Sequence, residues 1–449
     1  MIRCCAAMRH RSLTTLNIWR NPMSTHSLLR SNIPLRRTVF AIGANQLSDA
    51  MSYISVPLIM LFLTGSPENA SLALFATGVT RILASFLTGV IVDRYKPTYT
   101  LTLSCMGQCI TWIVLTLCVL ANVGSVPILI GILCVMALAS SFDYPSEQAI
   151  IARVVPTKQL GYASGLGETR ESAANLIGSP LAGLLASTSL ILTACVHAFV
   201  NFTAFLAAPS SSTVVHAERK HRQAGSETTV SDTVIDTQST GFFADLAQGL
   251  MYVVKNRVLV AIASVACCAN FAATGLPLVF IYYYAEQGIA AYSIGIFACV
   301  FGAGVLLGSL TVGWMTERFA LGTLGVLAVG MMVICYMTAA FTHDYFWITC
   351  ALMLISGVPL PAFNSSIVAY INASTPVDMI GRVHSAQGIP NMLLAPVAAL
   401  LAGIMYVQWG ISRTVLFYGS FMVLALILML SQRSLRTLPK LSEMAPASD

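Results

Sequence analysis

Two charged residues lie inside apolar stretches that are long enough to cross a membrane. Asp49 is near the middle of the first stretch, and Arg81 is near the middle of the second. A charge at the centre of a bilayer costs at least ~2.5 kcal/mol, so such a residue should face a cavity or a partner. In one interpretation, Asp49 binds and releases a proton while a solute and Arg81 compete for the same carboxylate. In the other, the two residues are a fixed structural pair.

A second group of charges lies at the end of the fourth apolar stretch and the start of the fifth. Asp143 and Glu147 are one helical turn apart, so they share a face of one helix. Glu168, Arg170 and Glu171 cluster in the fifth stretch. One interpretation is a charge network that opens and closes a gate. The other is a wet mouth with ordinary ion pairs worth ~0–1 kcal/mol each.

A short charged pattern occurs twice at the ends of apolar stretches. The acid and arginine are Asp93 and Arg94 in the first copy and Glu317 and Arg318 in the second, and a glycine precedes each acid by four residues. Glycine permits close approach of helices. A topology signal alone would need no acid, so the recurrence of the acid favours a bracing role between helices.

The stretches that must position these residues repeat as two halves. Three residues of the first half recur 220 positions later; Pro156, Gly161 and Gly183 return as Pro376, Gly381 and Gly403. Two similar membrane halves in one chain are the usual build of a carrier that rocks around a central site.

Composition excludes an ordinary soluble domain. Only 9% of the residues are charged, against about 25% in soluble proteins, and the mean hydropathy is +0.77. The net charge of +6 is spread over short connections and tails, so we expect no nucleic-acid partner. The twelve cysteines show neither metal nor disulfide spacing, so we expect no metal and no cofactor.

The chain contains twelve apolar stretches of the length that a bilayer requires, about 20 residues each. The predicted fold is an all-α membrane protein with twelve transmembrane helices in two six-helix, pseudo-symmetric halves, 38–208 and 258–431. A cytoplasmic linker at 209–257 and tails at 1–37 and 432–449 complete the domain plan. The stretches are 38–63, 71–92, 99–121, 126–147, 163–187, 188–208, 258–284, 291–315, 320–341, 345–367, 383–408 and 411–431.

Lysine and arginine predict the orientation. Apart from Arg81 and Arg170 inside the spans, they lie in the tails, the linker and the even-numbered connections, with Arg413, at the edge of the last helix, as the exception. The positive-inside rule therefore predicts that both termini are cytoplasmic. The Arg-rich first 35 residues fit a cytoplasmic tail, or a chain that starts at Met23, better than a transit peptide.

Several motifs, in order, carry a resemblance to a known family. The chain resembles the major facilitator superfamily over 38–431, and within it the bacterial drug and siderophore exporter branch. That branch includes macrolide efflux proteins and the enterobactin exporter. The motifs are those at 64–67, 89–94, 143–149, 175–183 and 376–383.

The resemblance implies roles for some of these residues. The paired charges at 93–94 and 317–318 would brace the outward-facing state, and Asp143 would belong to the inner gate. Gly178, Pro180 and Gly183 would kink the fifth helix and limit leak, although packing alone also explains them.

Other polar residues inside the spans have two possible roles. Asn45 and Asn175 could hydrogen-bond a substrate or bridge helices. The isolated His197 is expected to be a satisfied helix residue. The tyrosines at 282–284 are expected to anchor the protein at the membrane interface.

The resemblance implies a secondary active exporter that works by alternating access. Its substrate would be a hydrophobic or amphipathic small molecule, such as a drug, macrolide or siderophore, exchanged for protons. An uptake symporter and a non-transporting receptor or scaffold are the alternatives, and sodium is the alternative ion. No Walker loop and no catalytic constellation is present in the sequence, so we expect no enzyme. We expect a monomer in the lipid bilayer of the plasma membrane.

Overall fold

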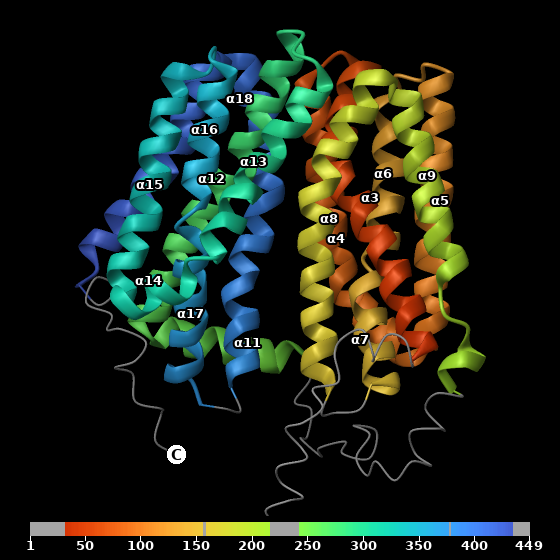
Figure 1. Ribbon diagram of the computed structural model, residues 1–449, viewed down its shortest axis with the longest axis horizontal. Coiled ribbons are helices and arrows are strands. Elements are labelled where there is room, and N and C mark those ends of the chain that lie inside the picture. The colour runs from red at the N-terminus through yellow and green to blue at the C-terminus, as the bar shows by residue number, and fades with distance from the viewer. Residues whose placement is uncertain (1–31, 156–158, 216–241, 377–378, 434–449) are drawn as a thin grey trace, which may run out of the picture.

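The computed structural model describes residues 32–155, 159–215, 242–376 and 379–433, and this part of the chain contains helices and no strands. The helices form two bundles that stand side by side, one from each half of the chain (Figure 1). The predicted all-α membrane fold is confirmed.

Seven helices make up the first bundle. The fourth span is divided, because its helix ends at Ser140 and a new helix begins at Asp143. The helices are α3 (Ile33–Thr64), α4 (Pro67–Arg94), α5 (Pro97–Leu120), α6 (Val126–Ser140), α7 (Asp143–Val154), α8 (Leu160–Thr188) and α9 (Leu190–Ala207).

The second bundle repeats this plan. Its last element, α18, is two helices that meet at Gly410, where φ is 73° and the backbone is not helical. The helices are α11 (Phe242–Lys255), α12 (Arg257–Glu286), α13 (Ala291–Ser309), α14 (Val312–Arg318), α15 (Leu321–Thr342), α16 (Phe346–Gly357), α17 (Leu360–Ser374) and α18 (Ile380–Ser431).

Apolar length accounts for most of the membrane crossings. Ten helical segments of the described chain are long and apolar enough to span a membrane, with α6 and α7 counted as one segment and α16 and α17 as another. Division of α18 at Gly410 adds one crossing. Helix α8 is the twelfth crossing. Its 29 residues are enough to span a membrane, although three charged residues in its first half make it less apolar than the other ten segments. The twelve expected crossings are thus present.

Helix boundaries differ from prediction in two places. Helix α3 begins at Ile33, inside the expected tail, because Asn32 caps it by accepting a hydrogen bond from the Leu35 amide at 3.1 Å. Helix α11 lies within the expected linker. Its 14 residues are too few to cross a bilayer, so a search for spans does not reveal it.

The two bundles meet at one end of the molecule, which we call the packed end. There Ser71 Oγ of α4 and Tyr282 OH of α12 are 2.9 Å apart. Helices α8 and α13 cross so closely that a Cβ on Gly183 would lie 2.7 Å from the Gly295 Cα. Only glycine allows that approach.

The opposite end, which we call the open end, carries α7, α11 and α14 (Figure 1). The helix-terminal basic residues Arg94, Arg153, Lys255 and Arg318 all lie there. Arg413 lies beyond Gly410 at the packed end. The basic residues at the helix ends are therefore concentrated at the open end of the molecule.

The expected tyrosine anchors are mostly core residues. Tyr282 and Tyr284 are fully buried, and the Tyr284 hydroxyl donates to the His343 carbonyl oxygen at 3.2 Å. The prediction of interface anchoring is wrong for these two. Hydropathy could not reveal this, because a tyrosine buried between helices and one at a lipid interface have the same local sequence.

His197 is a satisfied residue, as expected. Its ring nitrogens contact Ser48 Oγ at 2.8 Å and Ser55 Oγ at 3.0 Å. The ring stacks on Trp112 with 3.7 Å between centroids. It therefore stabilises the first bundle around α3, α5 and α9.

Candidate functional site

A cavity of about 1210 Å³ lies between the two bundles. Its wall is built from α3, α4, α6, α7 and α8 on one side and from α12, α13, α15, α16 and α17 on the other. Pockets that hold drug-sized ligands occupy roughly 300–1,000 Å³. The space is therefore sufficient for a large organic molecule.

The two walls of this cavity differ in charge. The wall from the second bundle has no charged lining residue among those described, and it includes Phe297, Phe301, Tyr336 and Met353. The wall from the first bundle carries all the charge, namely Asp49, Arg81, Asp143, Glu147, Glu168 and Glu171. A molecule in the cavity would thus meet an acidic face on one side and an apolar face on the other.

Asp49 and Arg81 approach one another, since Arg81 Nη2 is 3.5 Å from Asp49 Oδ1. Their side chains are 35% and 45% exposed to the cavity. The separation exceeds the usual range for a hydrogen bond, and an exposed pair of this kind contributes at most ~1 kcal/mol. Neither group is locked, so both remain accessible to a ligand or a proton.

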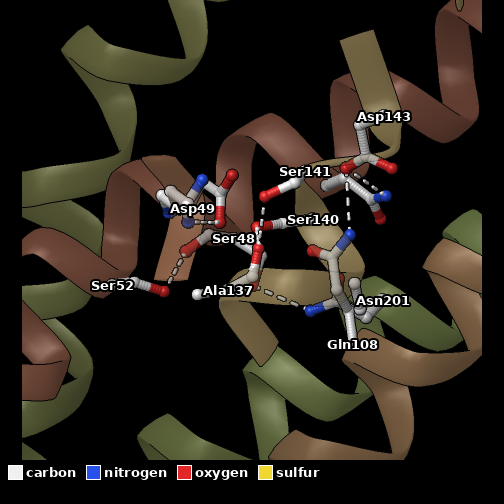
Figure 2. Close-up of polar contacts among 12 residues, drawn as sticks. Ser48, Asp49, Ser52, Gln108, Ala137, Ser140, Ser141, Asp143 and Asn201 are labelled. Atoms are coloured by element: carbon white, nitrogen blue, oxygen red, sulfur yellow. Dashed lines mark hydrogen bonds and ion pairs between the residues drawn. The ribbon is translucent and has the colours of Figure 1, made fainter. Parts of the chain in front are cut away.

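Asp143 occupies a different environment, in a dry pocket between α3, α5 and α7. Ser104 Oγ lies 2.6 Å from Asp143 Oδ1. The side-chain amides of Asn45 and Gln108 donate to Asp143 Oδ2 at 3.0 Å and 2.9 Å, and Figure 2 shows Gln108 reaching this carboxylate. Ser104 and Gln108 carry no signal of this role in the sequence, because uncharged polar residues inside spans usually only bridge helices.

Glu147 has a partner of its own, Arg170 of α8. Arg170 Nη1 and Nη2 donate to the two Glu147 oxygens at 2.7 Å and 3.0 Å, and its Nε donates to Gln46 Oε1 at 2.7 Å. The two side chains are only 5% and 11% exposed. A bidentate, nearly buried pair of this kind joins α7, α8 and α3 firmly. It does not fit the interpretation of a wet mouth.

Glu168 and Glu171 fit that wet interpretation better. Both are exposed on α8 and line the cavity. In the described part of the chain no ion pair involves either of them. Asn175 lies one turn beyond Glu171, also on the cavity wall. The five candidate gate charges therefore occupy three environments and do not form one network; they are Asp143, Glu147, Glu168, Arg170 and Glu171.

The recurring loop charges lie at the open end, away from the cavity. Arg94, Glu317 and Arg318 are exposed, and the Arg318 guanidinium lies over the Trp314 ring at 5.4 Å. Among the residues whose side chains are described, which leaves out Asp93, neither Arg94 nor Glu317 forms an ion pair. Their bracing role stays a prediction.

The small residues of α8 serve close packing. A Cβ on Gly178 would lie 2.6 Å from the Ala50 Cβ of α3, and Gly183 is the residue that meets Gly295 of α13. The helix is continuous from Leu160 to Thr188 with Pro180 inside it. Gly178 thus holds α8 to its own bundle, while Gly183 holds it to the other.

This architecture matches a known family. The model of the Major Facilitator Superfamily matches residues 38–388 and again 263–446. The chain belongs to this superfamily. It is therefore a multi-pass membrane protein and a secondary transporter that works by alternating access, and it is not an enzyme.

The similar curated proteins are distant. An uncharacterized MFS-type transporter of Bacillus subtilis (strain 168), YkuC, is 20% identical over 405 residues, covering 87% of this chain and 90% of the relative. Macrolide efflux protein A of Streptococcus pyogenes is 20% identical over 299 residues, covering 65% and 69%. A putative glycerol-3-phosphate transporter 2 of Arabidopsis thaliana is 24% identical over 363 residues, covering 76% and 68%.

Solved structures support the fold. A bacterial homologue of the human lysosomal transporter Spinster has a TM-score of 0.70 at 14% identity, covering 94% of this chain and 99% of that one. A bacterial homologue of the iron transporter ferroportin has a TM-score of 0.65 at 12% identity, covering 88% and 98%.

Proposed function

We propose that this protein exports an amphipathic small molecule across the plasma membrane in exchange for protons. The observation that carries the proposal is the pair of unlike walls around the central cavity. One wall is uncharged and aromatic, and the other is acidic. A molecule with an apolar body and a polar group complements both walls at once.

The charge of the acidic wall indicates the polar group. Asp49 and Glu147 have arginine partners, whereas Glu168 and Glu171 have no ion-pair partner in the described chain. A positively charged group on the substrate would be attracted to that side, and an anionic group would be repelled. We therefore favour amphipathic cations, a class that includes macrolides with an amino sugar, over anionic siderophores.

The direction of transport is supported by the ends of the molecule. The open end carries the basic helix termini, so the positive-inside rule assigns it to the cytoplasm. The bundles meet at the packed end, so the cavity of this conformation would be loaded from the cytoplasm. The relative named as a macrolide efflux protein also favours export. An uptake symporter on the same fold remains the alternative.

The experiment uses everted membrane vesicles that hold an acidic interior. We would add erythromycin, the cationic dye ethidium and an anionic catechol siderophore in turn, and compare them with vesicles that lack the protein. We expect erythromycin and ethidium to dissipate the pH gradient only when the protein is present. Binding of a cation without any movement of protons or dye would instead support a receptor, and movement of dye out of the vesicles along with protons would support a symporter.

A further inference from the structure

Two aspartates line the cavity and could carry a proton, Asp49 and Asp143. Asp49 has a basic partner, whereas no basic side chain of the described chain contacts Asp143. We propose that Asp143 is the residue that carries the proton during transport, and that it is protonated in the conformation described here. The inference rests on the proposed proton coupling and names the residue responsible for it.

Ser104 makes more short oxygen contacts than its single hydrogen can serve. Its hydroxyl oxygen lies 2.7 Å from the Ala139 carbonyl oxygen and 2.6 Å from Asp143 Oδ1. Both distances are those of O–H···O hydrogen bonds. A serine hydroxyl has one hydrogen, and a backbone carbonyl has none to give. One of these two contacts therefore needs a hydrogen that Ser104 cannot supply.

The neighbouring amides cannot supply it either. Gln108 Nε2 has two hydrogens, and it donates them to Ser104 Oγ at 3.1 Å and to Asp143 Oδ2 at 2.9 Å. Asn45 Nδ2 also has two, and it donates them to Asp143 Oδ2 at 3.0 Å and to Cys105 Sγ at 3.4 Å. Neither amide therefore has a hydrogen left for the Ser104 contacts.

A proton on Asp143 Oδ1 supplies the missing hydrogen. Asp143 then donates to Ser104 Oγ, and Ser104 donates to the Ala139 carbonyl. Asp143 Oδ2 keeps the role of a carbonyl oxygen and accepts from both amides. With this single addition each short contact has one hydrogen, and no charge is buried without a partner.

The position of Asp143 allows this proton to leave. The residue lines the cavity although it is only 9% exposed. The charged and titratable groups around it are Asp49 of α3, Cys105 of α5 and Glu147 of α7, and Arg170 of α8 is already held by Glu147. An arriving cation would meet no basic competitor at Asp143.

The exchange step then balances. The Oδ1–H bond of Asp143 breaks, its electron pair stays on the oxygen, and the proton passes to water in the cavity. The new carboxylate keeps its hydrogen bonds from Asn45 and Gln108 and attracts the cationic substrate. Reprotonation from the outer side would release the substrate, so one proton enters for one cation that leaves.

Infrared spectroscopy of the full-length protein in lipid tests the protonation directly, because a carboxylic acid and a carboxylate have different stretching bands. We expect a protonated-acid band in the wild type that Asp143→Asn lacks. Asp344→Asn is the matched control, since Asp344 is 69% exposed, and it should keep the band. Asp49→Asn should also keep it. Loss of the band in Asp49→Asn and its retention in Asp143→Asn would overturn the proposal, as would the absence of any such band.

Asparagine suits the test because its amide group can replace both roles of the protonated acid. Should Asp143→Asn fail to fold, Ser104→Ala provides a second measurement. Removal of the hydroxyl takes away the acceptor of the Asp143 proton, so the band should shift while the protein keeps its acid. An unshifted band would contradict the assigned geometry.

A transport measurement separates this inference from the proposed function. In vesicles, Asp143→Asn should lose the accumulation of ethidium that a pH gradient drives and the proton release that ethidium triggers, whereas the control Asp344→Asn should keep both. Accumulation that survives in Asp143→Asn would place the proton elsewhere. If wild-type vesicles move no probe at all, the proposed export function fails, whereas the infrared band still decides whether Asp143 is protonated.

Discussion

Removal of Arg170 should destabilise the protein far more than removal of Arg81. Arg170 makes two charge-assisted bonds to Glu147, at 2.7 Å and 3.0 Å, and both side chains are nearly buried. Loss of one partner of such a pair leaves an uncompensated buried charge and costs about 3–5 kcal/mol. Arg81 lies 3.5 Å from Asp49 and is 45% exposed, so Arg81→Met should cost at most ~1 kcal/mol.

A double-mutant cycle completes this test. Arg170→Met, Glu147→Gln and the double variant would be unfolded in a graded denaturing-detergent titration, with Arg81→Met as the matched control. The double variant should be more stable than the Arg170→Met variant, because it buries no unpaired charge. The reasoning would be refuted by a cost for Arg170→Met that equals that of Arg81→Met, or by single costs that simply add.

Three further results are expected. Gly183→Val should prevent closure of the packed end, because its side chain would meet Gly295 of α13. A thiol reagent applied from outside should then label the double variant Gly183→Val, Tyr282→Cys more than Gly183→Val alone; labelling no stronger than that of Tyr282→Cys by itself would contradict this. The double variant Glu168→Gln, Glu171→Gln should raise the KM for ethidium and leave that for an uncharged substrate unchanged, which transport kinetics would measure. His197→Ala should lower the free energy of unfolding by ~1–3 kcal/mol, because it removes a hydrogen-bond partner from the buried Ser48 and Ser55 hydroxyls. An unchanged midpoint of unfolding in denaturing detergent would argue against the assigned contacts.

Part of the candidate site could be foreseen because its signals are local. A charge in an apolar stretch is conspicuous, and consecutive antiparallel helices place residues at equal depth near each other. Asp49 and Arg81 follow this logic, and the structure places them 3.5 Å apart. The close approach at Gly183 is also a local signal, since glycine in a span commonly marks helix contact.

The sequence grouped Asp143, Glu147 and Arg170 but could not assign a partner to each acid. One helical turn separates the two acids, which predicts a shared face. Yet Asp143 faces Ser104 and Gln108 of α5, while Glu147 faces Arg170 of α8. Ser104 and Gln108 lie 39 and 35 residues before Asp143, whereas Arg170 lies 23 residues after Glu147 on the next helix. Which partner each acid takes depends on how each helix is rotated and packed.

The sequence alone determined the membrane class, the number of crossings, the two repeated halves and the end that carries the basic residues, because each depends on composition or on spacing along the chain. Only the tertiary structure decided that the charges form one wall of the cavity and that its opposite wall is uncharged. It also distinguished the dry, arginine-free Asp143 from the wet, paired Asp49. The physical reason is that burial and hydrogen bonding are properties of neighbours in space, and helix packing brings those neighbours together from separate parts of the chain.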